Sequence, residues 1–239
     1  MKCVVTAGLA AVVSLVGGSA ALASPVFYSS AGDAGDVLQF SNGDRVDARF
    51  RADRTNWDSR LEFDSFPNNG DATAGVVNGT NFANNTFGFE MSYDSSTSEL
   101  DWIITRPDNT TRTITQTLAG FGNLNIIQLF TVGSRGEVSL ANVQYSDSST
   151  TVSSFPSLAV GPSPAVTFKE TFLFFGDTFD LLADSWTLSG DVVFGTLSSN
   201  NPSEGAKLTV KLREGFIPGP GAAGLFAIAG LAAARRRRG

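Results

Sequence analysis

Histidine and cysteine, the residue types behind most nucleophilic and metal catalysis, are nearly missing from this sequence. Its 239 residues include no histidine, and Cys3 is the only cysteine. Without histidine, the Ser-His-Asp and Cys-His machineries are excluded, and so is nearly all zinc or iron catalysis. Cys3 precedes the first apolar run, whereas the cysteine of a lipoprotein follows it. We therefore expect no disulfide, no thiol nucleophile, no catalytic residue, no metal centre and no cofactor.

Basic residues are also scarce: the chain has 17 Lys and Arg against 23 Asp and Glu. Setting aside Lys2 and the four arginines 235–238 leaves 12 basic and 23 acidic residues, a net charge of −11. A surface this acidic repels nucleic acid and anionic lipid headgroups. We predict no nucleic-acid partner, whereas contact with a neutral or cationic polymer such as an extracellular polysaccharide is compatible with this charge.

The first residues have the three-part form of a secretory signal. Lys2 supplies the positive segment and Val4–Val16 the apolar segment, and Ala21 and Ala23 form the small-residue cleavage site. We predict that residues 1–23 are a signal helix, read by the Sec translocon and cut by signal peptidase after Ala23. The alternative is an uncleaved anchor, which the many small residues before the cleavage site disfavour.

A short apolar run precedes four cations at the other end of the chain. Ala222–Ala234 is shorter than the roughly 20 residues that a stable span needs, and it is rich in Ala and Gly, which insert weakly. Arg235, Arg236, Arg237 and Arg238 would stay on the cytoplasmic side and stop translocation. We predict a short transmembrane helix that holds the exported chain temporarily. A permanent single-span tail anchor is the alternative.

The motif Pro218-Gly219-Pro220 stands directly before this run. In order and spacing, residues 217–239 resemble the PEP-CTERM sorting signal of Gram-negative bacteria, which combines a Pro-Glu-Pro-type motif, an apolar helix and a terminal basic cluster. Gly219 departs from the Glu that is usual in that family. The resemblance implies an exosortase-type sorting enzyme as partner. It also implies an intermediate anchored in the inner membrane, followed by delivery to the cell surface or extracellular matrix.

Residues 24–216, between these ends, have the composition of an all-β domain. Phe is abundant, with 19 residues, and polar turn formers interrupt the apolar segments about every 8–12 residues, as in sandwiches and barrels. We predict one antiparallel β-sandwich of about ten strands that buries the Phe residues between two sheets. The predicted strands are 44–52, 57–63, 86–93, 100–105, 112–118, 124–132, 138–145, 167–175, 186–194 and 207–213.

Alternation of side chains predicts which face of a strand each residue occupies. In Lys207–Arg213 the apolar residues Leu208, Val210 and Leu212 share one face. Strict alternation in the strand 138–145 places Val138 and Tyr145 on opposite faces. Gly190, inside another strand, predicts either a bulge or a close approach of a neighbouring segment.

Three segments between strands have the composition of turns or loops. Asp94–Ser98 and Arg106–Asn109 are rich in turn-forming residues and predict hairpins. Ser146–Pro164 is rich in Ser, Thr and Pro, and is the best candidate for a linker between two small domains. We favour a long surface loop of one sandwich, because neither side of the segment has a convincing closed set of strands.

The first half of this body resembles the extracellular modules called choice-of-anchor domains, of the W-type. The similarity lies in Asp44–Arg49, Trp57, Leu61–Phe63 and the strand Phe87–Tyr93. It implies a β-sandwich of unassigned activity and adds no site residue.

Three kinds of candidate site remain. Carboxylate pairs about 5 or 9 Å apart would suit a glycosidase; solvated surface acids are the commoner explanation. Acidic loops would suit structural Ca²⁺; such sequences also form ordinary turns. Exposed tryptophans would suit stacking on sugars, whereas tryptophans in apolar runs usually pack in the core. The acid pairs are Asp58 with Glu62, Glu99 with Asp101, and Asp177 with Asp180. The loops are 33–36, 41–44 and 68–71, and the tryptophans are Trp57, Trp102 and Trp186.

Taken together, these features predict an exported, transiently anchored bacterial protein with a structural or adhesive role and no catalysis of its own. A carbohydrate-binding module that uses exposed aromatic residues is the first alternative. A glycosidase or lyase that works with carboxylates alone is the second. A closed surface would favour the structural role, a flat exposed aromatic face would favour sugar binding, and a groove with two acids and aromatic walls would favour the enzyme.

Overall fold

The computed structural model describes most of the chain between Pro25 and Ile217. The described residues are 25–28, 39–40, 45–54, 56–64, 72–78, 82–162, 166–198 and 205–217. Both predicted terminal helices lie outside them, and so do Ala21, Ala23, the motif at Pro218–Pro220 and the arginines 235–238. Within the described part, no helix has the length and apolar character that crossing a bilayer requires.

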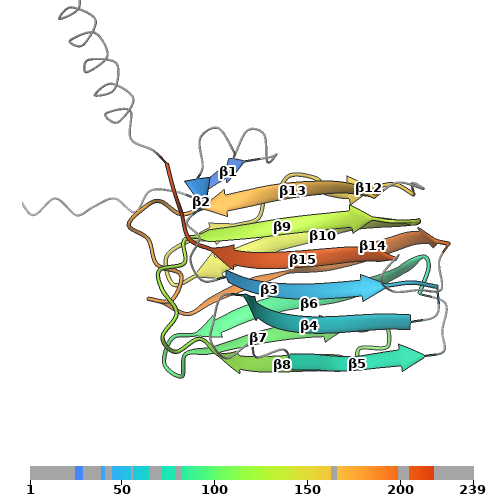
Figure 1. The fold of residues 1–239 in the computed structure, drawn as a ribbon, viewed down its shortest axis with the longest axis horizontal. Helices are drawn as coiled ribbons and strands as arrows, with labels where there is room; N and C mark the ends of the chain where they lie inside the picture. Colours follow the sequence, from blue (N-terminus) through green and yellow to red (C-terminus); the bar gives the residue numbers. More distant parts are fainter. Residues whose placement is uncertain are drawn as a thin grey trace, which may run out of the picture.

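Two stacked antiparallel sheets form the fold (Figure 1). The strands of the first sheet are, in spatial order, β1 (Val26–Tyr28), β13 (Thr167–Phe174), β9 (Ile126–Gly133), β15 (Ala206–Arg213), β3 (Arg45–Ala52), β4 (Asn56–Asp64) and β5 (Ala72–Asn78). Those of the second are β11 (Thr151–Val152), β10 (Gly136–Asp147), β14 (Trp186–Leu197), β6 (Asn85–Asp94), β7 (Glu99–Thr105) and β8 (Thr111–Thr117), and β12 (Ala159–Val160) also pairs with β10. A separate pair joins β16 (Gly215–Phe216) to β2 (Gln39–Phe40). The predicted all-β sandwich is confirmed.

An aromatic cluster occupies the space between the sheets. Phe50 of β3 is completely buried, and its ring lies 5.6 Å from Trp57 of β4 in the same sheet. It also lies 5.2 Å from Phe87 of β6 and 5.4 Å from Phe194 of β14, in the facing sheet, all in edge-to-face geometry. Edge-to-face contacts are favourable beyond the area that they bury. The cluster therefore stabilises the packing of the two sheets against each other around Phe50.

One buried hydrogen bond also crosses the core. The indole Nε1 of Trp102, on β7, donates to the hydroxyl of Ser59, on β4, over 2.8 Å. Both residues are buried, and a buried N–H costs free energy unless it finds an acceptor. The polar atoms of a tryptophan and a serine are thus satisfied between the sheets, and the bond adds directional specificity to the apolar packing.

The ten predicted strands are all present, with small differences at their ends. Among the described strands, one of comparable length, β5, was not predicted. The face assignment in β10 was wrong, because Val138 and Tyr145 are both buried in the core. The register shifts between Ala141 and Gln144, where β10 bulges against β14. An extra residue reverses the alternation beyond it.

Gly190 explains where this bulge sits. A Cβ on Gly190 would lie 2.9 Å from the ring of Phe89 and 3.1 Å from the Cα of Val143, so the expected close approach is confirmed. Asn142, in the bulge, has a φ of 52° and donates a side-chain hydrogen bond to Asp191 over 2.6 Å. Asparagine tolerates this left-handed conformation better than most residues.

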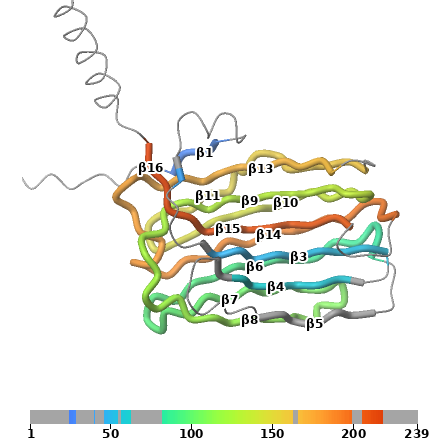
Figure 2. The backbone as a smooth tube through the Cα atoms, viewed as in Figure 1, coloured from blue at the N-terminus to red at the C-terminus, as the bar shows by residue number. Residues whose placement is uncertain are grey.

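The segment from Ser146 to Pro162 belongs to the sandwich. It contains the end of β10 and the short strands β11 and β12, which both pair back onto β10. Strands from before and after the segment are neighbours in both sheets: β13 and β15 flank β9 in the first, and β14 lies between β10 and β6 in the second (Figure 2). The segment therefore runs along one edge of the second sheet, and both sheets contain strands from before and after it.

Candidate functional site

A row of small polar side chains runs across the outer face of the second sheet. Directly paired positions place Ser146 of β10 beside Thr187 of β14, Thr187 beside Ser92 of β6, and Ser92 beside Asp101 of β7. Asp101 pairs in turn with Thr115 of β8, whose hydroxyl donates to its carboxylate. Adjacent residues in such a row lie about 5 Å apart. The row therefore presents a continuous line of hydroxyls and one carboxylate.

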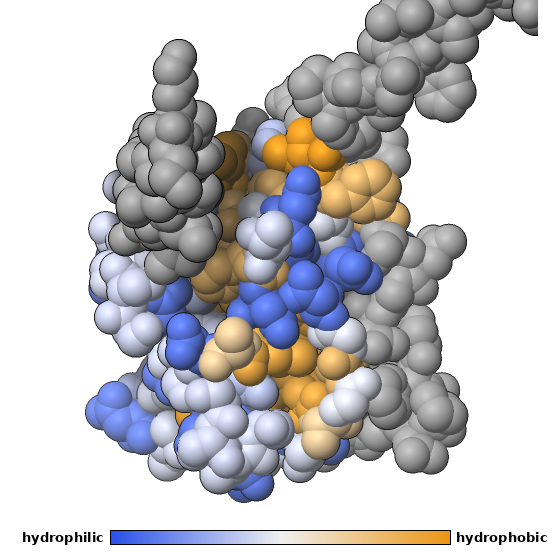
Figure 3. All heavy atoms as spheres, turned by 90° about the vertical axis from the view of Figure 1, so that its left-hand side faces the viewer, coloured by the Kyte–Doolittle hydropathy of each residue, from blue (hydrophilic) through white to orange (hydrophobic). Residues whose placement is uncertain are grey.

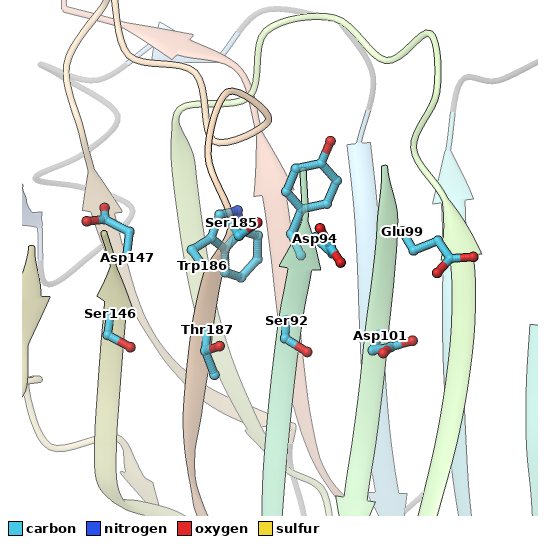
Figure 4. Close-up of a pocket in the computed structure, with 10 residues that line it drawn as sticks. Ser92, Asp94, Glu99, Asp101, Ser146, Asp147, Ser185, Trp186 and Thr187 are labelled. Carbon is cyan, nitrogen blue, oxygen red and sulfur yellow. The ribbon is translucent and has the colours of Figure 1, made fainter. Parts of the chain in front are cut away.

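The other four residues of this row, without Thr115, line an open hollow at one end of the sheet, with a volume of about 350 Å³. The end of β6, the start of β7 and the segments around Asp147 and Ser185 surround it (Figure 4). Its lining residues are Ser92, Tyr93, Asp94, Glu99, Asp101, Ser146, Asp147, Ser185, Trp186 and Thr187. Four carboxylates and several hydroxyls thus surround one depression.

Two identical turns flank the hollow. The sequence Asp-Ser-Ser-Thr occurs at 94–97 and again at 147–150. In the first, the backbone N–H of Ser96 donates to Asp94 over 2.8 Å and its hydroxyl over 2.7 Å. In the second, Ser149 donates to Asp147 in the same way, over 2.7 and 3.0 Å. The carboxylate of each aspartate therefore stabilises the turn that begins with it.

These contacts set the charge of the two aspartates. Hydrogen bonds from Ser96 lower the pKa of Asp94. For Asp147, partial burial raises the pKa, but hydrogen bonds from Ser149, Tyr145 and Thr150 outweigh it, so the pKa is lowered. Burial is the main cause that raises the pKa of Tyr145, whose hydroxyl donates to Asp147 over 2.9 Å. Both aspartates are therefore held as carboxylates near neutral pH.

Asp147 should make stability depend on pH. Because its pKa is lower in the folded than in the unfolded chain, where it is near 3.9, its contribution is complete above that value and disappears as the pH falls through the folded pKa. We expect Asp147→Asn to lower Tm by a few degrees at pH 7 and by a smaller amount at pH 3, which lies below the unfolded pKa. Calorimetric melting of both proteins at the two pH values tests this, and an equal difference at both would contradict it.

The three predicted acid pairs have different outcomes. Glu99 and Asp101 do share the outward face of β7 and both line the hollow. Asp58 and Glu62 lie on the first sheet, and both form ion pairs with arginines. Arg51 donates two hydrogen bonds to Asp58. Arg49 donates to Glu62 over 2.5 Å. This second pair forms an ion-pair network on the outer face of β3 and β4.

The third acid pair supports loops at the same end of the sandwich as the hollow. Asp180 accepts hydrogen bonds from the N–H of Leu182 over 2.9 Å and of Leu124 over 3.5 Å. Asp177 accepts one from the N–H of Ile217 over 3.0 Å. Each carboxylate satisfies backbone donors outside the regular strands, which is a structural use of an acid.

The three tryptophans form no exposed platform. Trp57 and Trp102 are completely buried and Trp186 is 3% exposed, with its indole N–H donating to the carbonyl of Leu181 over 2.8 Å. Tyr93, the other aromatic residue beside the hollow, is 5% exposed. Both rings therefore close the core beneath the hollow, and the core assignment of Trp102 and Trp186 is confirmed.

No metal centre emerges from the described residues, in which no group of three or more acidic, histidine or cysteine side chains is arranged to hold an ion. The candidate calcium loops 33–36, 41–44 and 68–71 lie outside the described residues. Of the four acids that line the hollow, Glu99 and Asp101 were candidates from the sequence, whereas Asp94 and Asp147 were not. The repeated Asp-Ser-Ser-Thr is the sequence signal that would have singled out Asp94 and Asp147.

A clamp holds the last described residues to the body. Asn125, almost completely buried, donates through Nδ2 to the carbonyls of Gly176 and Gly215, over 2.9 and 2.8 Å. Its Oδ1 accepts from the N–H of Gly215 over 2.9 Å. Together with the bond from Ile217 to Asp177, these contacts fix the backbone up to the residue before Pro218.

No protein-family model matches this chain, and no curated protein matches it either. The similarity of residues 217–239 to a PEP-CTERM signal, and of the body to W-type choice-of-anchor domains, therefore stays a prediction from the sequence.

Proposed function

We propose that this chain is an exported bacterial β-sandwich, held temporarily at the inner membrane by its C-terminal segment and then presented at the cell surface or in the extracellular matrix. Its role there is structural or adhesive, and it performs no catalysis. An exosortase-type enzyme would process the tail. The terminal sequence patterns supply the destination, and the arrangement of the body supports it.

The supporting observation is that the described body starts and ends at one end of the sandwich. Val26 pairs with Phe174 at the end of β13, and Ile217 binds Asp177, three residues further along the chain. An anchor after Ile217 would hold this end toward the bilayer. The turn between β7 and β8, at the other end of the strands, would then point outward (Figure 1).

Two exposed hydrophobic side chains lie at this end, while two others, Val166 and Phe168, lie at the start of β13, at the other end of the strands. Val26 is 49% and Phe216 is 43% exposed, and both lie beside the point where the described chain ends. Figure 3 looks onto this end and shows hydrophobic surface among hydrophilic residues. Apolar side chains next to an anchor would be covered by the lipid surface or by a processing enzyme during the anchored stage.

The hollow supports the two alternatives less well. A glycosidase needs one acid whose pKa is raised so that it can donate a proton, and for two of the four acids of the hollow, Asp94 and Asp147, the pKa is shifted the other way. Sugar stacking needs an exposed ring, whereas Trp186 and Tyr93 are buried. The hydroxyl row is the one observation that favours a polysaccharide ligand, which it would bind through hydrogen bonds alone.

The proposal predicts where the chain is cut and what the arginines do. In Gram-negative cells that have an exosortase, intact-mass spectrometry should find a protein that starts at Ser24 and lacks the segment after the Pro218–Pro220 motif. In cells without the enzyme, the uncut protein should fractionate with the inner membrane. Replacing Arg235, Arg236, Arg237 and Arg238 by Gln should release it into the periplasm, because the stop to translocation is lost.

Two matched proteins make this test specific. Replacing four cations of the body by Gln, at Lys207, Lys211, Arg106 and Arg112, removes the same charge and should leave the membrane fraction unchanged. A carrier protein fused to residues 217–239 should gain membrane retention. If the wild type and the terminal Gln variant distribute identically, the proposed destination is wrong.

A further inference from the structure

Strand β8 is a long edge of the second sheet. Among the described strands it pairs only with β7, while the opposite edge of this sheet consists of the two-residue strands β11 and β12. Natural sheets usually protect an edge with a short strand, a bulge, a proline or lysines. β8 has seven residues, Thr-Arg-Thr-Ile-Thr-Gln-Thr. It is not short and contains no proline and no lysine, and Arg112 is its single cation.

The hydrogen bonds of the hairpin show which backbone groups point outward. Arg106 N–H bonds to Thr110 O over 2.8 Å, and Leu118 N–H to Ser98 O over 2.8 Å. In antiparallel pairs, hydrogen-bonded and non-bonded pairs alternate. Between these two contacts the bonded residues of β8 are thus Arg112, Ile114 and Gln116. The N–H and C=O groups of the four threonines point away from β7, toward the open edge.

The sequence of this edge is nearly symmetric about Ile114. Reading outward from it in either direction gives Thr, then Arg112 or Gln116, then Thr. When two copies are related by a two-fold axis at Ile114, Thr113 lies opposite Thr115 of the second copy, and Thr111 opposite Thr117. These are the residues whose backbone groups point outward. All seven residues of each strand are therefore used, and every outward N–H meets a carbonyl.

Side chains fit this arrangement as well. All four threonines are exposed on the outer face, and directly opposed threonines are favourable cross-strand pairs. Arg112 would face Gln116 of the second copy, so no like charges meet. A self-complementary patch of this kind is what a closed two-fold dimer requires.

We propose that β8 pairs antiparallel with β8 of a second copy, centred on Ile114, and joins the second sheets of the two copies into one continuous sheet. The two-fold axis closes the contact, so this edge forms a dimer and no fibre. At the cell surface the dimer would offer two copies of the hollow on one face. The inference does not depend on how the C-terminal segment is processed.

Two double variants test both the dimer and its register. In Thr113→Lys with Thr115→Lys, each lysine faces a lysine of the other copy, and the dimer should dissociate at least tenfold more readily. In Thr113→Glu with Thr115→Lys, each glutamate faces a lysine and the dimer should persist. Both variants carry the same Thr115→Lys change beside Asp101, so they differ from each other only at position 113. Native mass spectrometry of the full chain released from detergent, over a range of concentrations, measures the dimer fraction.

A proline variant tests the backbone contribution. Thr113→Pro removes an N–H that points outward and is not used by β7, so the fold should be retained. Circular dichroism and Tm confirm folding, and the dimer fraction should fall. A monomeric wild type, a proline variant that dimerises as well as wild type, or equal dissociation of the two charge variants would each overturn the proposal.

Discussion

Replacing Phe50 by alanine should lower the free energy of unfolding by about 3–5 kcal/mol, the range for removing a buried phenylalanine ring. The ring is completely buried and contacts Trp57, Phe87 and Phe194, which come from both sheets. The rings around it are held by strands on two sides, so they cannot collapse fully into the space left behind, and a cavity adds to the lost burial. Urea denaturation followed by circular dichroism measures the change.

Phe168 provides the matched control for this substitution. It is the same residue type in another strand of the first sheet, but it is 56% exposed and its one close ring partner is Phe130 at 5.2 Å. Phe168→Ala should therefore cost less than about 1 kcal/mol, as exposed substitutions usually do. Equal losses for Phe50 and Phe168 would show that the aromatic cluster does not carry the contact between the sheets.

The fold was predictable because apolar alternation and turn formers are both strong in this sequence. In strands such as β6, the apolar residues occupy every second position, so the sequence alone predicts which face is buried. Its residues Phe87, Phe89, Met91 and Tyr93 all face the core. Turn composition found the hairpins at Asp94 and Arg106. What periodicity cannot provide is the order of the strands, because pairing is decided by contacts that are distant along the chain.

Two misses have local physical causes. The strand β5, Ala-Thr-Ala-Gly-Val-Val-Asn, contains alanines and a glycine, which have low preference for strands. The sequence therefore did not predict a strand here, although β5 pairs with β4. In β10, the bulge opposite Gly190 reversed the faces of the residues beyond it. Gly190 predicted a local irregularity in its own strand. The sequence did not show that the extra residue would lie in the neighbouring strand β10.

The candidate site was less predictable than the fold. Glu99 and Asp101 were paired correctly because a spacing of two residues places side chains on one face of any strand. Asp147 joins them only because β10 and β14 bring it across the sheet to the same hollow. Asp58 was grouped with Glu62 by spacing alone, and its arginine partner on β3 could be known only from the register.

Replacing Asn125 by alanine should release the end of the body from the sandwich. The change leaves the N–H of Gly215 and the carbonyls of Gly176 and Gly215 without their side-chain partner in a buried position. An unsatisfied buried group costs about 1–3 kcal/mol, so we expect a loss of several kcal/mol locally. Hydrogen exchange at Gly215 and Ile217 should accelerate at least a hundredfold, and proteolysis within 214–217 should become faster.

Asp177→Ala separates this clamp from the last contact beyond it. Among the described residues, Asp177 accepts a hydrogen bond from the N–H of Ile217 at an exposed position and none from Gly215, so its loss should accelerate exchange at Ile217 and leave Gly215 protected. If Asn125→Ala likewise affects Ile217 alone, the amide side chain is not the clamp. If both glycine and isoleucine are released, Asn125 sets the length of chain between the sandwich and Pro218. Under the proposed function, the anchored body would then be held close to the bilayer, because Asn125 fixes the chain shortly before the predicted sorting motif.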